Sequence, residues 1–479
     1  MKEIPESDII LEEFFIKYKL ETIGEKMENN KANEMETMEI PKLAIKTSLP
    51  MIISMISIAL YGIVDTIFVS NISESALTAI SLAYPIQNII TGIGLGTGIG
   101  LNSLLARTLG EKKESKVQKT IFNGIILTVL TWIIIAIISV ISIKPFLLYF
   151  TKDVELISLA SSYSYIISIL SIGTLFQITI EKILEAYGNA KESMIVQISG
   201  SVINLILDPI LIYGMLGFPK LGIAGAAIAT VIGQLIGMLI GVFYIKKYKL
   251  ITPKISKENL KLDKDIVKNI YKVGIPTMVL EIISSIIIIL LNKVLIEFST
   301  LAVSVWGVYG KVDKFVLITI YGLNYGMIPI IAYNYGAKRK DRVIEAIKFF
   351  LKLGLIVTAV GTILVMMLPV QILNAFEVSK ETIEIGIPAF RILSSGFIFA
   401  SVNMILSASF QAFGNATYSL IIKLLRKIII TVPLIYMFKE IFGITGVWCA
   451  FVIAEVVTMI ISFILFKKTY NKLLKIEEV

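Results

Sequence analysis

Long apolar segments alternate with short polar connections along the chain after residue 41. A helix needs about 20 apolar residues to cross the roughly 30 Å of a bilayer's hydrocarbon core. Twelve segments meet this length, near residues 43–70, 76–108, 118–148, 156–187, 193–216, 221–246, 266–297, 301–333, 342–374, 382–412, 417–438 and 443–467. The pattern therefore predicts an all-α polytopic membrane protein with twelve transmembrane helices.

The polar connections differ in charge between the two sides of the predicted membrane. Lysine and arginine gather in the second, sixth and eighth connections, whereas the first, SNISES, and the seventh, EFST, carry neither. Cytoplasmic loops of membrane proteins carry such an excess of positive charge. We therefore expect a protein of the cell membrane with both termini in the cytoplasm. The first forty residues lack the apolar core of a secretory signal, and 9–20 are expected to form a short amphipathic helix.

The two halves of the chain repeat one another at a constant offset of 226 residues. This offset places Pro50 on Pro276, Gly96 on Gly322, Gly100 on Gly326, Ala106 on Ala332, Gly110 on Gly336, and 188–190 on 414–416. Because each half holds an even number of crossings, both halves enter the membrane in the same sense. We therefore expect two six-helix lobes that face each other across a cleft, the architecture of an alternating-access carrier. The expected organisation is a cytoplasmic tail at 1–41, a first lobe at 42–246, a cytoplasmic linker at 247–265, a second lobe at 266–470 and a cytoplasmic tail at 471–479.

Composition agrees with a membrane protein and limits its chemistry. Hydrophobic residues make up 56% of the 479 positions and charged residues 17%, which excludes a water-soluble globule. The chain has one cysteine, Cys449, and no histidine, so it lacks the residues that most often bind zinc or act as catalytic bases. We therefore expect neither an enzyme nor a cofactor. The net charge of +9 comes from lysines clustered between apolar segments, so nucleic acid is not an expected partner.

Polar residues in three segments of the first half form the candidate coupling site. Asn204 and Asp208 lie one helical turn apart in an apolar segment, and Pro209 follows. Asp65, Asp208 and Thr230 each lie roughly five to eight residues from the outer ends of their segments, which places them at a similar depth at 1.5 Å per residue. If these side chains meet, they offer oxygen ligands for Na⁺, or a carboxylate pair that exchanges a proton.

The second half carries buried charges of its own. Glu281 lies mid-way along one segment, and Lys311, Asp313 and Lys314 lie at a comparable depth in the next. A structural ion-pair cluster and a surface facing the substrate are both consistent with this pattern, because membrane interiors tolerate charges that are paired. Glu181, Glu185, Arg426 and Lys427, nearer the cytoplasmic ends, are interpreted as snorkelling or interlobe pairs.

At these residues the chain resembles the multidrug and toxic compound extrusion (MATE) transporters, most closely the MepA-type bacterial branch. The resemblance rests on the spacing from Pro50 to Asp65, on NxxxDP at 204–209, on GAAxAT at 225–230, on GLNYGMIPIIAYNYGAKRKDRV at 322–343, and on QAFGNA at 411–416. It implies a bacterial antiporter that exports amphipathic, often cationic compounds in exchange for Na⁺ or H⁺. It also implies that Asp65, Asn204, Asp208 and Thr230 bind the coupling cation.

The substrate cleft and the oligomeric state are the remaining expectations. Candidate cleft residues are Glu281, Asn292, Lys311, Asp313 and Gln411, and the protein is expected to act as a monomer in the lipid bilayer. The acidic segment ITIEKILEAYG at 178–188 and the 311–314 charges depart from the family pattern and leave the substrate's charge open. A flippase for a lipid-linked precursor is the nearest alternative, although flippases of this superfamily usually have additional helices. An integral membrane enzyme and an ion channel are more distant alternatives.

Overall fold

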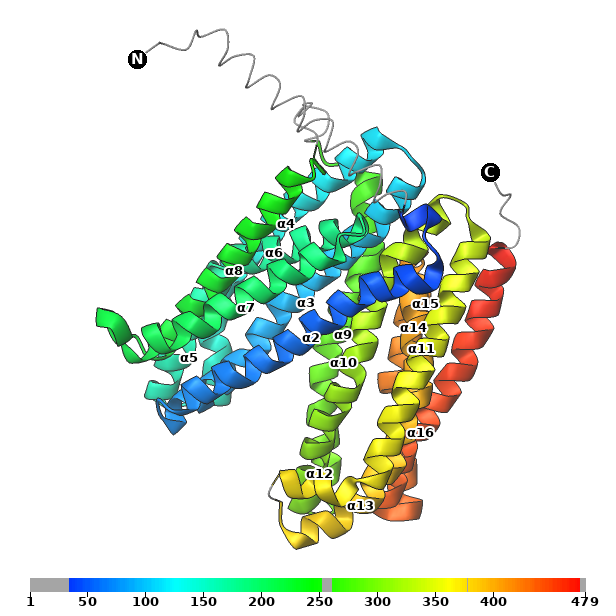
Figure 1. Cartoon of the computed structure of the whole chain (residues 1–479). Helices are drawn as coiled ribbons and strands as arrows, with labels where there is room; N and C mark the ends of the chain where they lie inside the picture. Colours follow the sequence, from blue (N-terminus) through cyan, green and yellow to red (C-terminus); the bar gives the residue numbers. More distant parts are fainter. Residues whose placement is uncertain (1–33, 252–260, 377, 474–479) are drawn as a thin grey trace, which may run out of the picture.

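The computed structural model describes residues 34–251, 261–376 and 378–473, without the side chains of 280–289, 416 and 472–473. Throughout these residues the secondary structure is helical, as predicted, and strands are absent from the described ranges (Figure 1). The amphipathic helix predicted at 9–20 lies outside the described residues.

The long helices follow the predicted segments closely. Their bounds are α2 Ile40–Ser70, α3 Glu74–Gly110, α4 Glu114–Phe150, α5 Val154–Ile169, α6 Ile172–Ala186, α7 Ala190–Tyr213, α8 Ile223–Lys247, α9 Lys264–Ile296, α10 Thr300–Gly336, α11 Lys340–Met367, α12 Pro369–Ala375, α13 Lys380–Ser394, α14 Gly396–Ala412, α15 Ala416–Leu424 and α16 Thr431–Leu473. A 3₁₀ turn, η1, spans Met215–Gly217, and a π-helical turn, η2, spans Leu425–Ile429.

Two breaks divide long apolar stretches into shorter helices. The axes of α5 and α6 differ by 45° at a break of a few residues. Gly443 has φ +59°, a conformation that side-chain-bearing residues rarely adopt, so α16 changes direction there. Within the described residues, nine helices are long and apolar enough to cross a membrane, and ten if α5 and α6 together form one span. The structure is therefore a polytopic helical bundle, whereas the exact number of twelve spans stays a prediction.

The helices form two groups that meet at one end of the molecule and diverge towards the other (Figure 1). Helices α3 to α8 lie in one group and α10 to α16 in the other. Helix α2 runs along the first group and α9 along the second, and the beginning of each contacts the opposite group where the two meet. The start of α2 and the end of α16 lie at the end where the groups meet.

The internal repeat is visible in the positions at which helices begin. The starts of four helix pairs are each 226 positions apart: Glu74 and Thr300, Glu114 and Lys340, Val154 and Lys380, and Ala190 and Ala416. The caps repeat as well, because Ser73 accepts the N–H of Ala76 at 3.0 Å and Ser299 accepts that of Ala302 at 3.1 Å. Side-chain oxygens of this kind satisfy backbone donors that a helix leaves free at its start. The same local chemistry therefore starts corresponding helices in both halves.

The glycines shared by the two halves lie at close contacts between the groups. A Cβ atom added to Gly110 of α3 would overlap the backbone of Tyr333 in α10, and one added to Gly336 of α10 would overlap the backbone of Arg107 in α3. These two contacts are related by the 226-residue offset. Gly96 of α3 and Gly274 of α9 likewise face each other, each with the other's carbonyl oxygen 2.7 Å from its added Cβ. The repeat therefore marks the surface through which the halves hold each other, as close helix packing in membranes requires small residues.

We expect Gly110→Ala to destabilise the contact between the two groups, because the new methyl group has no room beside Tyr333. Overpacking of this kind costs about 1–3 kcal/mol. The apparent Tm of the purified protein in detergent should fall. The matched control is Gly307→Ala in α10, where an added Cβ meets nothing within 4 Å. Its Tm should stay level or rise, and equal Tm values for the two variants would contradict the contact.

Candidate functional site

Three of the four predicted coupling residues lie together at the interface of α7 and α8. Asn204, Asp208 and Thr230 are 2%, 0% and 3% exposed, respectively. In the amide orientation that satisfies both ends of Asn204, Nδ2 donates to Oδ2 of Asp208 at 3.1 Å, and the side-chain oxygen accepts from the N–H of Thr230 at 3.0 Å. Asn204 therefore bridges the carboxylate of α7 to the backbone of α8.

Asp65 of α2 completes this group from the neighbouring helix. Its carboxylate lies within hydrogen-bonding reach of that of Asp208, so negative groups from two separate helices meet. Oδ1 of Asp65 is buried, and no donor among the described residues reaches it. A carboxylate oxygen without a donor suits a proton or a metal cation, because either would satisfy the oxygen and reduce the repulsion between two carboxylates.

Two tyrosines beside the carboxylates were not singled out from the sequence. Tyr61 lies one turn before Asp65, with its hydroxyl near Thr230. Tyr163 of α5 is 2% exposed, and its hydroxyl donates to Oε1 of Gln87 at 3.4 Å. The position of Tyr61 one helical turn before Asp65 could have identified it as a neighbour of the carboxylates. The sequence contains no signal that predicts Tyr163 beside them. Both tyrosines lie close enough to the two carboxylates to interact with them electrostatically.

The donor set fits a small cation. The cluster supplies two carboxylates, one amide and one hydroxyl, from Asp65, Asp208, Asn204 and Thr230. Hard cations prefer oxygen ligands of these kinds. These residues would hold Na⁺ through carboxylate, amide and hydroxyl oxygens, or a proton through the carboxylate pair. The assignment of this cluster as the coupling site stays a prediction.

The candidate cleft residues of the second half are dispersed. Gln411 of α14 lines a cavity of about 130 Å³. Lys311 of α10 is exposed, with Nζ 5.1 Å from the ring centre of Phe376, and Asn292 of α9 is half-buried; neither lines this cavity. Asp313 lies close enough to Arg426 and Lys427 to interact with them electrostatically. The side chain of Glu281 lies outside the described residues.

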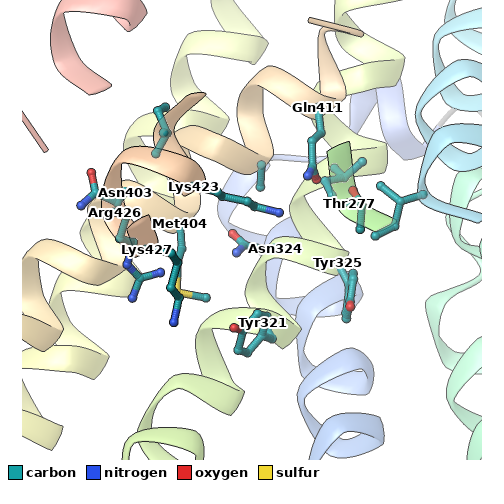
Figure 2. A pocket seen from close by; sticks show the side chains of 14 residues that line it. Thr277, Tyr321, Asn324, Tyr325, Asn403, Met404, Gln411, Lys423, Arg426 and Lys427 are labelled. Atoms are coloured by element: carbon teal, nitrogen blue, oxygen red, sulfur yellow. The ribbon is translucent and has the colours of Figure 1, made fainter. Parts of the chain in front are cut away.

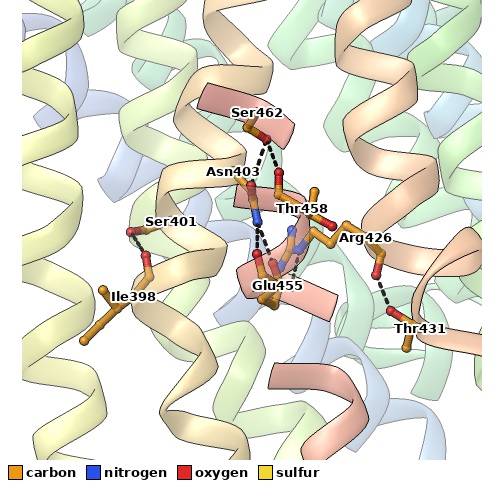
Figure 3. Close-up of polar contacts among 8 residues, drawn as sticks. All are labelled: Ile398, Ser401, Asn403, Arg426, Thr431, Glu455, Thr458 and Ser462. Atoms are coloured by element: carbon orange, nitrogen blue, oxygen red, sulfur yellow. Dashed lines mark hydrogen bonds and ion pairs between the residues drawn. The ribbon is translucent and has the colours of Figure 1, made fainter. Parts of the chain in front are cut away.

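A polar network in the second half was also missed from the sequence (Figure 3). Arg426 forms an ion pair with Glu455 of α16, and the two side chains are only 12% and 15% exposed. Nδ2 of Asn403 donates to Oε2 of Glu455 at 3.0 Å, and Ser462 donates to Oδ1 of Asn403 at 2.9 Å. Arg426 is therefore held inside the bundle and does not snorkel to an interface.

The acidic segment of α6 is buried as well. Glu181, Lys182 and Glu185 are 7%, 4% and 4% exposed, and Nζ of Lys182 lies 2.8 Å from Oε2 of Glu185. Lys182 also lies 4.1 Å from the ring centre of Tyr325 in α10. The burial of Glu181 and Glu185 excludes the snorkelling predicted for them from the sequence. The contact with the other helix group comes from Lys182, which the sequence interpretation did not include.

Comparison with known proteins identifies the family of this chain. The MatE family model matches the chain twice, at residues 50–210 and 276–437. The chain belongs to the MatE family. The two matches begin 226 residues apart, at the offset of the internal repeat. MATE proteins are transporters and not enzymes, in agreement with the expectation from composition.

Relatives of known name and structure cover nearly the whole transporter. The multidrug export protein MepA of Staphylococcus aureus (strain MSSA476) is 26% identical over 90% of this chain and 94% of its own length. A crystal structure described as MATE in complex with MaL6 matches with a TM-score of 0.85 at 25% identity, over 92% of this chain and 99% of that one. A structure described as the outward-facing conformation of a multidrug resistance MATE transporter matches with a TM-score of 0.85 at 24% identity, over 92% and 98%, and supports the fold alone.

We expect Arg426→Gln to destabilise this MATE protein strongly, because it leaves Glu455 buried without its cation. Breaking one side of a buried pair costs about 3–5 kcal/mol, whereas replacing both partners is often nearly neutral. The double variant Arg426→Gln/Glu455→Gln should therefore recover most of the lost Tm. Lys42→Gln is the control, because Lys42 and its partner Glu39 are both exposed and exposed pairs contribute about 0–1 kcal/mol. A double variant no more stable than Arg426→Gln would show that the pair is not the cause.

Proposed function

We propose that this MATE transporter is a cation-coupled antiporter that exports amphipathic compounds by alternating access. The observation that carries the proposal is the meeting of Asp65, which is partly buried, with Asp208, which is fully buried, from two separate helices. A carboxylate pair in a membrane-spanning region is costly unless it binds a cation, so its occupancy gives the protein two electrostatic states.

The proposed topology has twelve spans in two lobes, with both termini in the cytoplasm of a bacterial cell. Helix α9 runs for 33 residues, although the side chains of 280–289 are not described. The break at Gly443 divides the apolar stretch from 417 to 471 into two parts. Counting α9 as a span, and the stretch from 417 to 471 as two spans instead of one, raises the ten candidate spans to the twelve expected from the sequence. The proposed lobes are 42–246 and 266–470.

The described conformation supports an outward-facing state. The helix groups diverge at the end away from the start of α2 and the end of α16 (Figure 1). With these ends in the cytoplasm, the end at which the two helix groups diverge faces the outside, where the substrate leaves. In the proposed cycle, a cation then binds at Asp65 and Asp208, favours closure of the outer side, and leaves on the cytoplasmic side.

The membrane potential provides enough free energy for export. One charge moving inward through 100 mV releases about 2.3 kcal/mol, which corresponds to roughly fiftyfold accumulation of a neutral substrate. Na⁺ and H⁺ are both compatible with the oxygen ligands of the cluster. The multidrug export function in the name of the relative supports a broad set of amphipathic compounds, and cationic ones remain the expectation from the family resemblance.

We expect Asp208→Asn to abolish coupled export, because an amide can neither release a proton nor attract Na⁺ as a carboxylate does. The measurement is dye uptake by everted membrane vesicles driven separately by a proton gradient and by a sodium gradient. The ion that drives uptake identifies the coupling cation.

Asp341→Asn is the matched control, because Asp341 is exposed in the first turn of α11. It should transport at the parental rate, and both variants should reach the membrane at equal levels. Gradient-driven uptake by Asp208→Asn at the parental rate would refute the role of the carboxylate pair.

A further inference from the structure

Residues 34–38, which precede α2, lie at the end of the molecule where the two helix groups meet (Figure 1). We call this segment the N-terminal strap. Residues 34–37 are helical, and the side chain of Met35 is 1% exposed. A solvated tail would leave such an apolar side chain in water. The strap is therefore packed against the bundle, and its contacts involve both helix groups.

Arg342 and Asn334 hold the strap to the second helix group through its carbonyl oxygens. Nη2 of Arg342 in α11 donates to the carbonyl oxygen of Met35 at 3.0 Å and to that of Met38 at 2.7 Å. Nδ2 of Asn334 in α10 donates to the same oxygen of Met35 at 3.1 Å. Nε of Arg342 donates to Oδ1 of Asn334 at 2.9 Å, so the two donors hold each other in place. Hydrogen bonds from a charged donor are stronger than neutral ones, so this attachment is firm.

The side chain of Met35 contacts the first helix group, at the turn between α6 and α7. A Cβ atom added to Gly188 in that turn would lie 3.0 Å from Cε of Met35. Gly188 has φ +79°, which suits glycine, and its lack of a side chain lets the methionine approach the backbone. Met35 therefore contacts the second group with its carbonyl oxygen and the first group with its side chain.

Glu36 lies between basic residues of the two groups. Its Oε2 is 3.1 Å from Nζ of Lys112, which follows α3, and its Oε1 is 3.6 Å from Nη1 of Arg339, which precedes α11. These pairs are partly exposed, so each one contributes little attraction. Without the carboxylate, however, the two cations would repel each other across the contact between the groups. Glu36 therefore removes a repulsion, whereas Met35 and Arg342 provide most of the attachment.

The strap lies beyond one end of a cavity to which both groups contribute (Figure 2). The lining includes Ile99 of α3 and Asn324 and Ile328 of α10. Asn334, which holds the strap, follows Ile328 by six residues in α10, or about 9 Å at 1.5 Å per residue. For this cavity to open towards the cytoplasm, the helix groups must separate at this end. Because the strap contacts both groups, their separation has to break one set of its contacts.

We propose that the N-terminal strap is a latch that holds the two helix groups together on the cytoplasmic side and thereby favours the outward-facing state. The inference rests on the proposed alternating-access function and adds an element that sets the equilibrium between its two states. Opening of the cytoplasmic side then requires Met35 to leave either Gly188 or Arg342. The latch lies outside the carboxylate cluster, so a variant of the strap changes this equilibrium while Asp65 and Asp208 stay intact.

The test measures distances between spin labels at both ends of the full-length protein in lipid nanodiscs. One label pair is attached through Ser115→Cys and Lys348→Cys, towards the end where the groups meet. The other pair is attached through Lys152→Cys and Glu381→Cys, at the opposite end. All four positions are exposed, and Cys449→Ala removes the one native thiol. In the outward-facing state the first pair is close and the second is far apart, and the inward-facing state reverses both.

Two variants weaken the latch in different ways. Met35→Ala removes the side chain that packs against Gly188 and should raise the ratio of inward-facing to outward-facing protein about tenfold, the scale of a buried methionine side chain losing its contacts. Glu36→Lys places a third cation between Lys112 and Arg339 and should raise the same ratio about threefold, because partly exposed charges interact more weakly. The Tm of each variant, measured alongside, shows that it is folded.

Glu39→Lys is the matched control for Glu36→Lys. It makes the same change in charge three residues away, but the partner of Glu39 is Lys42 in the same helix, and both are exposed. It should leave both distance distributions as they are in the parental protein.

Parental distance distributions in Met35→Ala would overturn the latch, as would a shift in Glu39→Lys as large as that in Glu36→Lys. A parental protein whose two label pairs keep the same distances at every pH and Na⁺ concentration would instead refute the proposed alternating access. The two failures are therefore distinguishable.

Discussion

Two carboxylates in contact within a medium of low dielectric constant cannot both remain charged without a partner. Asp65 and Asp208 meet under this constraint, and Asn204 and Thr230 fix the geometry around Asp208 without supplying a positive charge. Neutralisation of this pair therefore requires a proton or a bound cation. In the proposed cycle, the surrounding helices present this pair to one side of the membrane at a time.

Helix α2 links that pair to the contact between the lobes. Asp65 lies near its end, whereas Ser48 and Ile52 near its beginning pack against Gly326 and Gly322 of α10. Pro50 lies between these two contact residues and removes a backbone hydrogen bond from the helix. One helix thus contacts the second lobe and carries half of the carboxylate pair. This continuity gives the proposed coupling a physical route, since a cation that draws α2 towards α7 also acts on the α2–α10 contact.

The sequence predicted the scaffold and the proximity of Asp65 to Asp208 better than the arrangement of charges in the second half. Helix starts and packing glycines follow from periodicity and the 226-residue repeat, and depth along the helix was enough to group Asp65 with Asp208. Depth does not determine which way a helix faces. Lys311 lies at a depth similar to the other charges but is exposed beside Phe376, and the pairing of Arg426 with Glu455 depends on the π turn and on the rotation of α16. The periodicity of apolar residues predicts neither the exposure of Lys311 nor the pairing of Arg426 with Glu455.

The two halves share a backbone but not their buried charged residues. The 226-residue offset places Asp208 on Leu434 and Asp65 on Leu291, and in the opposite direction it places Arg426 on Gly200 and Glu455 on Ala229. The conserved offset applies to caps and glycines, which any copy needs in order to fold and pack, whereas the charges differ between the copies. A duplicated scaffold can in this way hold a carboxylate pair in one lobe and the ion pair of Arg426 with Glu455 in the other. Because the ion pair compensates its own charges and the carboxylate pair does not, only the carboxylate pair needs a proton or a bound cation.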